Sequence, residues 1–195
     1  MPAGADRPTR LRLFVAVPVP EELLESLAEQ AAPLKERLAG GRWAPLANQH
    51  VTLKFLGWVG ADVLDGLRVA LRGACAGLAP AEVRIGGLGS FPSKRRVRVL
   101  WAGFEDPQRL LVRLNDVIEK AVEPLGFERE QRAFSPHLTI ARFKTPQRLQ
   151  EELPPLEKTA LGGFVVNAAR LYRSHLSPKG AQYEVLEEFE LRGDE

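Results

Sequence analysis

The hydrophobic pattern changes period several times along the chain, and each change marks a predicted element. Residues 11–17 are rich in β-branched and aromatic side chains, which favours a strand. Residues 21–38 carry apolar side chains at helical spacing, and the glycines at 40 and 41 end that helix. The same criteria predict strands at 50–56, 81–88, 97–104, 137–143, 163–171 and 182–191, and helices at 63–78 and 108–122.

Glycine and proline set several of the expected boundaries. We expect Gly57 to close the strand at 50–56, and the glycine-rich stretch 86–92 to form a turn. The basic run at 94–98 follows it, and is either a solvated loop leading into a strand or a rim that attracts phosphate. Residues 147–153 are expected to form a short helix at most.

Two segments share the pattern His-apolar-Thr-apolar, at 50–53 and at 137–140. In an extended strand, residues i and i+2 point to the same face. Each segment therefore presents one His and one Thr on one side and buries its apolar residues on the other. The chain has three histidines, and two of them lie in these segments.

The two segments also have similar surroundings. Phe14 precedes His50 by 36 residues, and Trp101 precedes His137 by the same interval. The predicted order around both is strand, helix, motif strand, helix, strand. This repetition predicts a duplicated strand–helix–strand unit related by a pseudo-twofold axis.

The repeats span about residues 11–90 and 97–191, and no Pro/Gly/Ser-rich linker separates them. We therefore expect one bilobal domain over residues 1–195 rather than two free domains. Two lobes that face each other would bring both His-x-Thr faces to a single cleft.

Two imidazoles and two hydroxyls in one cleft fit acid–base chemistry at phosphorus. An unperturbed imidazole titrates near pH ~6.5, so one ring can accept a proton from water while its protonated partner donates one to a leaving alkoxide. Each Thr hydroxyl, two residues along on the same face, can donate a hydrogen bond to a phosphoryl oxygen. This chemistry requires no metal and no other cofactor.

Other uses of the histidines find less support. A zinc site needs three or four ligands, but Cys75 lies in an apolar helix and no carboxylate stands at ligand spacing beside either His. The chain has no Gly-rich P-loop for nucleoside triphosphates and no Gly-x-Ser-x-Gly elbow of a serine hydrolase.

Composition adds limits on location. The net charge is +2, with 27 Lys and Arg against 25 Asp and Glu, which by itself does not indicate nucleic-acid binding. The single cysteine allows no internal disulfide, which fits a reducing compartment. No apolar run approaches the ~20 residues that span a bilayer, and residues 1–12 do not resemble a signal peptide. We therefore expect a cytoplasmic protein.

The segments His50–Gly57 and Ser135–Arg142 resemble the two motifs of the 2H phosphoesterase superfamily. Within it, the chain resembles the bacterial and archaeal RNA 2',3'-cyclic phosphodiesterases, historically called 2'-5' RNA ligases. The resemblance covers nearly the whole chain, including residues 12–17, 42–48, 91–101, 171–174 and 177–180.

The resemblance implies an α+β fold in which two antiparallel sheets face a central cleft, with helices outside. It implies metal-independent hydrolysis of 2',3'-cyclic phosphate ends of RNA to 2'-phosphate ends, with ATP-independent, reversible 2'-5' ligation as a second activity. The expected partner is RNA with a cyclic end, tRNA fragments among them. We expect no membrane partner and a monomer.

Carried onto this sequence, the resemblance makes His50 and His137 the catalytic pair, with Thr52 and Thr139 holding the phosphate. We assign His50 as the general acid on the 3'-oxygen and His137 as the general base for water. The pseudosymmetry leaves the reverse assignment open.

Arg142 would contact the phosphate, but its position raises a geometric problem. Arg142 and Phe55 each lie five residues after their histidine, so strict alternation places both on the opposite face. Each must lie past the end of its strand or at a bulge. Phe55 either stacks on the terminal base or packs in the core, and Phe14 is a second stacking candidate.

Two tryptophans and one histidine remain. Trp43 and Trp101 are expected in the core rather than as stacking platforms, and His175 on the surface or in a loop. Two further functions stay open: a phosphodiesterase for small cyclic nucleotides or 2'-5' oligonucleotides, and a non-catalytic RNA-binding module. The basic run at 94–98 favours RNA, and the two motif histidines argue against a silent module.

Overall fold

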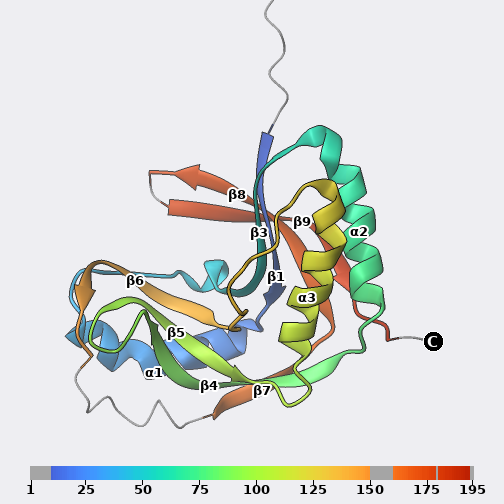
Figure 1. Cartoon of the computed structure of the whole chain (residues 1–195). Helices are drawn as coiled ribbons and strands as arrows, with labels where there is room; N and C mark the ends of the chain where they lie inside the picture. The colour runs from blue at the N-terminus through green and yellow to red at the C-terminus, as the bar shows by residue number, and fades with distance from the viewer. Residues whose placement is uncertain (1–9, 150–159, 179, 194–195) are drawn as a thin grey trace, which may run out of the picture.

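The computed structural model describes residues 10–149, 160–178 and 180–193 (Figure 1). The described strands are β1 (Arg10–Pro18), β2 (Gly41–Trp43), β3 (His50–Gly60), β4 (Ala81–Phe91), β5 (Val97–Glu105), β6 (Leu138–Gln147), β7 (Ala160–Val166), β8 (Ala168–Ser177) and β9 (Gly180–Glu190). The described helices are α1 (Glu21–Arg37), α2 (Leu64–Ala76) and α3 (Leu110–Val122), with short 3-10 turns η1 (Leu46–Asn48), η2 (Ala61–Val63) and η3 (Glu123–Leu125). None of the described helices is long and apolar enough to cross a membrane.

The described strands form one antiparallel sheet in the order β7-β4-β5-β6-β3-β1-β8-β9, with β2 paired to β6. Its two halves meet where β3 and β6 pair, at Val51 and Leu138. The α+β class with antiparallel pairing is confirmed. The two expected sheets are joined at this point into one.

The halves of the sheet mix strands from both halves of the sequence. β4 lies between β5 and β7, whereas β8 and β9 follow β1. In Figure 1, α2 and α3 cover one half of the sheet, and α1 lies against the other half. The predicted repeats at 11–90 and 97–191 therefore do not correspond one to one with the two halves, and the duplication itself stays a prediction.

Several predicted boundaries are wrong. β3 does not end at Gly57 but continues to Gly60. Gly57 has a positive φ of 73°, which a glycine can adopt inside a strand without ending it. The glycine-rich stretch 86–91 belongs to β4, where the register shifts at Gly87. The strand expected at 163–171 is divided at Asn167 between β7 and β8.

The short helix expected at 147–153 is not seen where the chain is described. Gln147 is the last residue of β6, and residues 150–153 lie outside the described residues.

Strand β1 separates two apolar clusters. Leu13, Val15 and Val17 point into the main core, which includes the buried sides of all three described α-helices. Phe14 and Ala16 point to the opposite face. There they form a small second cluster with Tyr172, against which Tyr183 packs. This second face of β1 becomes the floor of the cleft described next.

Candidate active site

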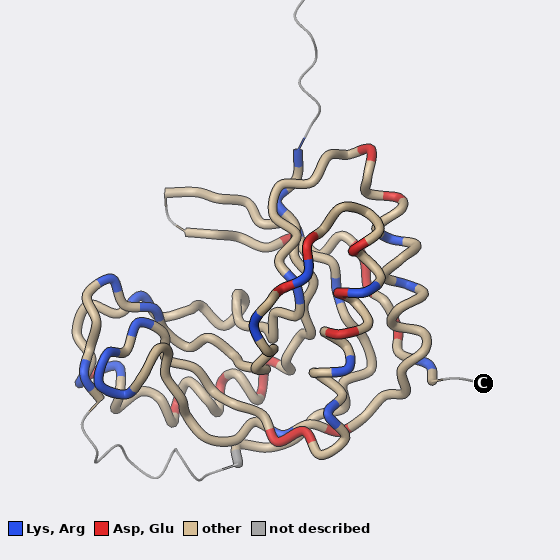
Figure 2. Tube along the Cα trace, viewed as in Figure 1, with Lys and Arg blue, Asp and Glu red and all other residues tan. Residues whose placement is uncertain are grey.

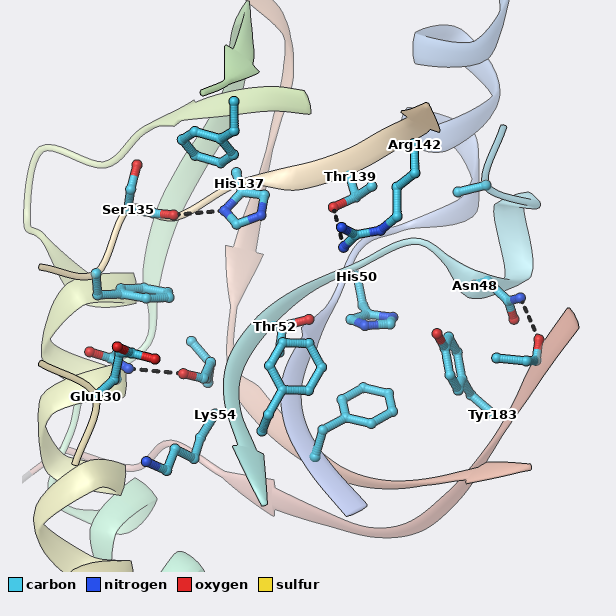
Figure 3. A pocket seen from close by; sticks show the side chains of 18 of the residues that line it. Asn48, His50, Thr52, Lys54, Glu130, Ser135, His137, Thr139, Arg142 and Tyr183 are labelled. Atoms are coloured by element: carbon cyan, nitrogen blue, oxygen red, sulfur yellow. Dashed lines mark hydrogen bonds between the residues drawn. The ribbon is translucent and has the colours of Figure 1, made fainter. Parts of the chain in front are cut away.

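A cleft of about 950 Å³ is lined by both His-x-Thr segments (Figure 3). Its walls come from β1 and β3, from β6 with the loop that precedes it, and from the ends of β8 and β9. The cleft brings together every side chain that the sequence nominated for the site: Phe14, His50, Thr52, Phe55, His137, Thr139 and Arg142.

A bulge in β6 explains how Arg142 reaches the cleft. Opposite two successive residues of β5, β6 presents Thr139 and then Ala141, so Ile140 is an extra residue. The bulge shifts the alternation by one and returns Arg142 to the face of His137. Its Nη2 lies 3.4 Å from Thr139 Oγ1.

Strand β3 has the same bulge at the same place. It presents Thr52 and then Lys54 opposite successive residues of β1, so Leu53 is the extra residue. Phe55 thereby returns to the face of His50. Of the two solutions left open for residues five after the histidine, the bulge is confirmed on both strands.

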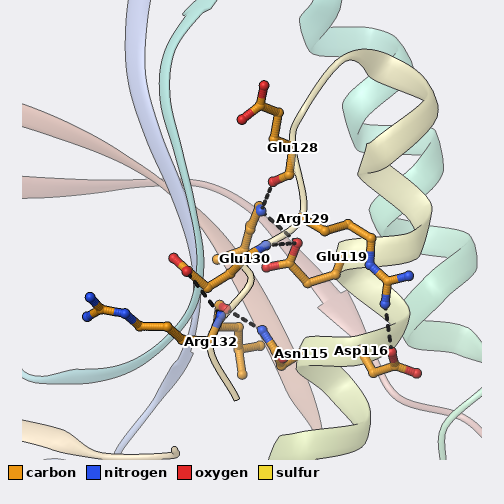
Figure 4. A network of polar contacts seen from close by, with 9 residues as sticks. Asn115, Asp116, Glu119, Glu128, Arg129, Glu130 and Arg132 are labelled. Atoms are coloured by element: carbon orange, nitrogen blue, oxygen red, sulfur yellow. Dashed lines mark hydrogen bonds and ion pairs between the residues drawn. The ribbon is translucent and has the colours of Figure 1, made fainter. Parts of the chain in front are cut away.

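An α-helix stabilises the bulge in β3. Asn115 on α3 donates a hydrogen bond from Nδ2 to the Leu53 carbonyl at 2.9 Å (Figure 4). A bulge disrupts the ladder locally, so a side-chain donor satisfies the carbonyl that it frees.

Aromatic rings surround His50. Phe14 stacks on its imidazole with centroids 4.8 Å apart, and Tyr183 meets it edge-on at 5.2 Å. Tyr172 stacks on Phe14 at 5.0 Å and lies 5.7 Å from the imidazole centroid, nearly parallel to that ring as well. Burial of the ring lowers the pKa of His50 from 6.5 to about 4, because desolvation disfavours the charged imidazolium. His50 is therefore neutral at neutral pH.

His137 has a different environment. Its Nδ1 lies 2.8 Å from the Ser135 carbonyl oxygen (Figure 3). A carbonyl only accepts, so Nδ1 carries the hydrogen and donates it, and Nε2 is left for the substrate. Phe91 contacts the ring edge-on with centroids 5.1 Å apart, and Trp101 lies at 6.3 Å.

The two imidazoles are thus unequal in the folded chain. Burial favours a neutral His50, whereas His137 is oriented by the hydrogen bond from its Nδ1 to the Ser135 carbonyl. The assignment of His50 as acid and His137 as base stays a prediction, and the pseudosymmetry still leaves its reverse open.

The stacking candidates differ in exposure. Phe55 is 65% exposed, so it is available to a base and does not pack in the core. Phe14 is 3% exposed, because it is enclosed by His50 and the tyrosines. Phe14 therefore supports the His50 ring and is not a platform for a base.

The remaining sequence candidates lie at the edge of the site or outside it. Trp43 is half-buried and lines the cleft, whereas half-buried Trp101 packs against Phe91. His175 is exposed on β8, in a strand and not a loop, with Nε2 2.8 Å from Glu184 Oε2. Cys75 is buried in α2, away from the cleft lining, and burial raises its pKa to about 12.

Basic side chains outnumber acidic ones in the cleft. Among the described lining residues, six are Lys or Arg and three are Asp or Glu. Two of the acids are in ion pairs within the lining, Glu119 with Lys54 and Asp116 with Arg129. Outside these two pairs the lining retains four arginines and one glutamate, namely Arg12, Arg42, Arg132, Arg142 and Glu130. This excess of positive charge suits a phosphate. In the described part of the chain, no group of three or more His, Cys, Asp or Glu side chains is arranged to hold a metal ion.

Sequence reasoning assigned no role to several residues of the site. Ser135 contributes its backbone carbonyl, which every residue type has, so the amino-acid type at this position could not reveal its role. Tyr183 comes from the final strand, and only the tertiary fold brings it to His50. Arg42 lies opposite Arg142 in the pairing of β2 with β6, and so joins the basic wall.

A buried polar network connects the two sides of the site (Figure 4). Lys54 Nζ lies 2.6 Å from Glu119 Oε2 on α3 and donates to the Glu128 carbonyl at 2.6 Å. The backbone N–H of Glu130 donates to the same Glu119 oxygen at 3.4 Å. These contacts fasten the loop between η3 and β6, the loop that carries Ser135 to His137.

Comparison with known proteins places this geometry in a family. Residues 19–178 match the model of the 2'-5' RNA ligase superfamily. An RNA 2',3'-cyclic phosphodiesterase of Methanothermobacter thermautotrophicus is 34% identical over 185 residues, which cover 93% of this chain and 100% of that protein.

Solved structures agree on the fold. A crystal structure of a Thermus thermophilus protein has a TM-score of 0.80 at 32% identity, covering 95% of this chain and 100% of that one. E. coli LigT complexed with 3'-AMP has a TM-score of 0.77 at 24% identity, covering 94% and 99% of the two chains. The fold, the doubled His-x-Thr cleft and these relatives together show that the chain belongs to the 2'-5' RNA ligase superfamily of 2H phosphoesterases.

Proposed function

We propose that this chain is an RNA 2',3'-cyclic phosphodiesterase that opens cyclic phosphate ends to 2'-phosphate ends. The observation that carries the proposal is the convergence of His50, Thr52, His137, Thr139 and Arg142 on one cleft. Relatives that match over nearly their whole length are named for this activity.

In the proposed reaction the two roles of the sequence-based assignment are exchanged, because burial favours a neutral His50. Neutral His50 accepts a proton from water as the water oxygen bonds to phosphorus. The bond between phosphorus and the 3'-oxygen breaks, and His137 donates its Nε2 proton to that oxygen. The products are a 2'-phosphate and a 3'-hydroxyl. Each of the two proton transfers typically contributes ~10²- to 10⁴-fold to the rate.

The other side chains of the site act on the phosphoryl oxygens. The Thr52 and Thr139 hydroxyls donate hydrogen bonds to the non-bridging oxygens, and Arg142 supplies a cation beside Thr139. Donors that are already in position stabilise negative charge as it grows on these oxygens in the transition state.

The same arrangement of side chains can also catalyse ligation. A 5'-hydroxyl in place of water attacks the cyclic phosphorus, and cleavage of the bond to the 3'-oxygen leaves a 2'-5' linkage. No nucleoside triphosphate is consumed, because the strained ring supplies the activated phosphate. We propose ligation as a secondary activity of the same two histidines.

The decisive experiment maps the products from a cyclic-ended oligonucleotide treated with purified protein in EDTA. We expect a 2'-phosphate and a free 3'-hydroxyl. An intact cyclic end would refute the proposal, and a 3'-phosphate would refute its regiochemistry. Loss of activity in EDTA that returns with added metal would show that the mechanism is not carried by the histidines alone.

A further inference from the structure

Strand β3 carries a second exposed aromatic side chain beyond the cleft. Among the described residues, Phe55 and Trp58 are the aromatic side chains that are more than half exposed, at 65% and 57%. Phe55 lines the cleft, whereas Trp58 lies three residues further along the strand and is not part of the cleft lining. The proposed reaction assigns no role to Trp58.

The pairing of β1 with β3 shows that Trp58 is on the catalytic face. Every second residue of β1 points to one face, and the residues opposite them on β3 share it. Along β1 the members of this face are Pro18, Ala16, Phe14 and Arg12, and their partners on β3 are His50, Thr52, Phe55 and Trp58. Bulges at Leu53 and Leu56 keep the two aromatic rings in this row.

Arginine lies next to Trp58 on the same face. Arg12 is directly opposite Trp58, lines the cleft, and donates from Nη1 to Ser174 Oγ at 3.1 Å. Arg10 lies two residues away on β1 and donates from Nη2 to the Trp58 carbonyl at 3.4 Å. In the described part of the chain neither arginine is paired with a carboxylate. Exposed aromatic rings beside cations are the combination that binds single-stranded nucleic acid.

We propose that Trp58, with Arg12 and Arg10, forms a binding site for the nucleotide that precedes the cyclic end of an RNA strand. This inference rests on the proposed function, and it takes exposed Phe55 at the cleft as the stacking partner of the terminal base. Three residues of strand span at most about 10 Å, so two neighbouring bases of one chain can reach both rings. The face of β3 therefore favours a cyclic end on an oligonucleotide over a cyclic mononucleotide.

The basic segment at 94–98 offers a rival path for the RNA. It runs from the connection after β4 into the first residues of β5, on the other half of the sheet, where blue positions gather in Figure 2. That surface presents charge but no aromatic side chain as exposed as Trp58 among the described residues. Stacking and charge occur together along β1 and β3, which is why the observations favour that path.

The test compares adenosine 2',3'-cyclic phosphate with a dinucleotide that has the same cyclic end. Base stacking on an aromatic side chain contributes enough that W58L should raise KM for the dinucleotide about tenfold or more. The kcat for the dinucleotide and the kcat/KM for the mononucleotide should stay unchanged. W58F keeps a π-face and should retain most of the dinucleotide preference, whereas R95Q/R96Q serves as the matched control on the rival path.

Equal effects of W58L on both substrates, or no effect on either, would overturn the proposal. A length-dependent loss in R95Q/R96Q but not in W58L would place the RNA on the basic segment and overturn it as well. Binding of the dinucleotide that ends in a 2'-phosphate provides a readout independent of turnover. W58L should weaken that binding about tenfold while leaving adenosine 2'-phosphate unaffected. Should the wild type open neither cyclic substrate, the proposed function fails, and the binding comparison still decides the role of Trp58.

Discussion

Lys54 and Glu119 form a buried ion pair, with Nζ and Oε2 2.6 Å apart and side chains only 8% and 6% exposed. Lys54 directly follows the bulge residue of β3, and Glu119 lies on α3 beside the loop that leads to His137. The pair therefore joins the strand of one catalytic histidine to the support of the other.

The first prediction concerns the cost of breaking this pair. K54M leaves the Glu119 carboxylate buried without its partner, and we expect a loss of ~3–5 kcal/mol in the free energy of unfolding. The double variant K54M/E119M removes both charges and should recover most of that loss. Urea unfolding of the three proteins measures both values. If the single and double variants are equally unstable, the ion pair is not the source of the effect.

The second prediction distinguishes acid from base. H137A should lose ~10²- to 10⁴-fold in kcat on a cyclic RNA end, because the 3'-oxygen leaves without a proton. A cyclic substrate with sulfur in place of the 3'-oxygen has a leaving group that needs no proton, so it should restore most of the rate of H137A. H50A should stay slow on both substrates. Rescue of H50A instead would mean that His50 is the acid.

The third prediction follows from the stacking of Phe14 on His50. The acid limb of kcat/KM reports the pKa of the base in the free enzyme, so the wild-type limb should fall near pH 4. F14L uncovers part of the imidazole and lowers the desolvation penalty. Its acid limb should therefore move upward toward pH ~6.5, the value of a free imidazole. A limb that stays in place in F14L would show that ring burial does not set the His50 pKa.

The fourth prediction concerns stability against pH. The pKa of His50 is about 4 in the folded chain, below the value of 6.5 for an exposed ring. Between these pH values the unfolded chain binds the proton more readily, so wild-type stability falls as pH decreases from 6.5 to 4. H50F has no such group. Relative to the wild type it should gain up to ~3 kcal/mol across this window, with no pH-dependent difference above it.

Unfolding free energies at a series of pH values provide the measurement. The carboxylates common to both proteins cancel in the difference between H50F and the wild type. A difference that does not vary with pH would contradict the lowered pKa.

The sequence identified the chemistry of the site better than its geometry. The His-x-Thr pattern located four side chains of the cleft because period-two alternation holds within each short segment. Alternation fails five residues after each histidine, since one extra residue at Leu53 and at Ile140 reverses the parity. Nothing in the apolar letters at those positions marks a bulge.

The equal spacing of Phe14 and Trp101 from the histidines was informative in a different way than expected. Both aromatic rings do lie close to their histidine. Their registers differ, because Trp101 is opposite Thr139 whereas the residue opposite Thr52 is Ala16. The equal intervals therefore do not put the two rings at equivalent positions in the sheet.

The inequality of the two histidines depends on contacts between residues distant in sequence. Tyr172 and Tyr183, which help to bury His50, come from the last two described strands. A local pattern contains no information on which imidazole will be enclosed. The acid–base assignment therefore requires the tertiary structure.

The pairing of Val51 with Leu138 is where β3 and β6, the strands of the two His-x-Thr segments, are joined in the described sheet. Each of these residues directly follows one of the two motif histidines, so one rung of the backbone ladder holds the two histidine backbones beside each other. The β8–β9 hairpin joins this part of the sheet only through β1, so we expect a substitution in the hairpin to leave the spacing of these two backbones unchanged.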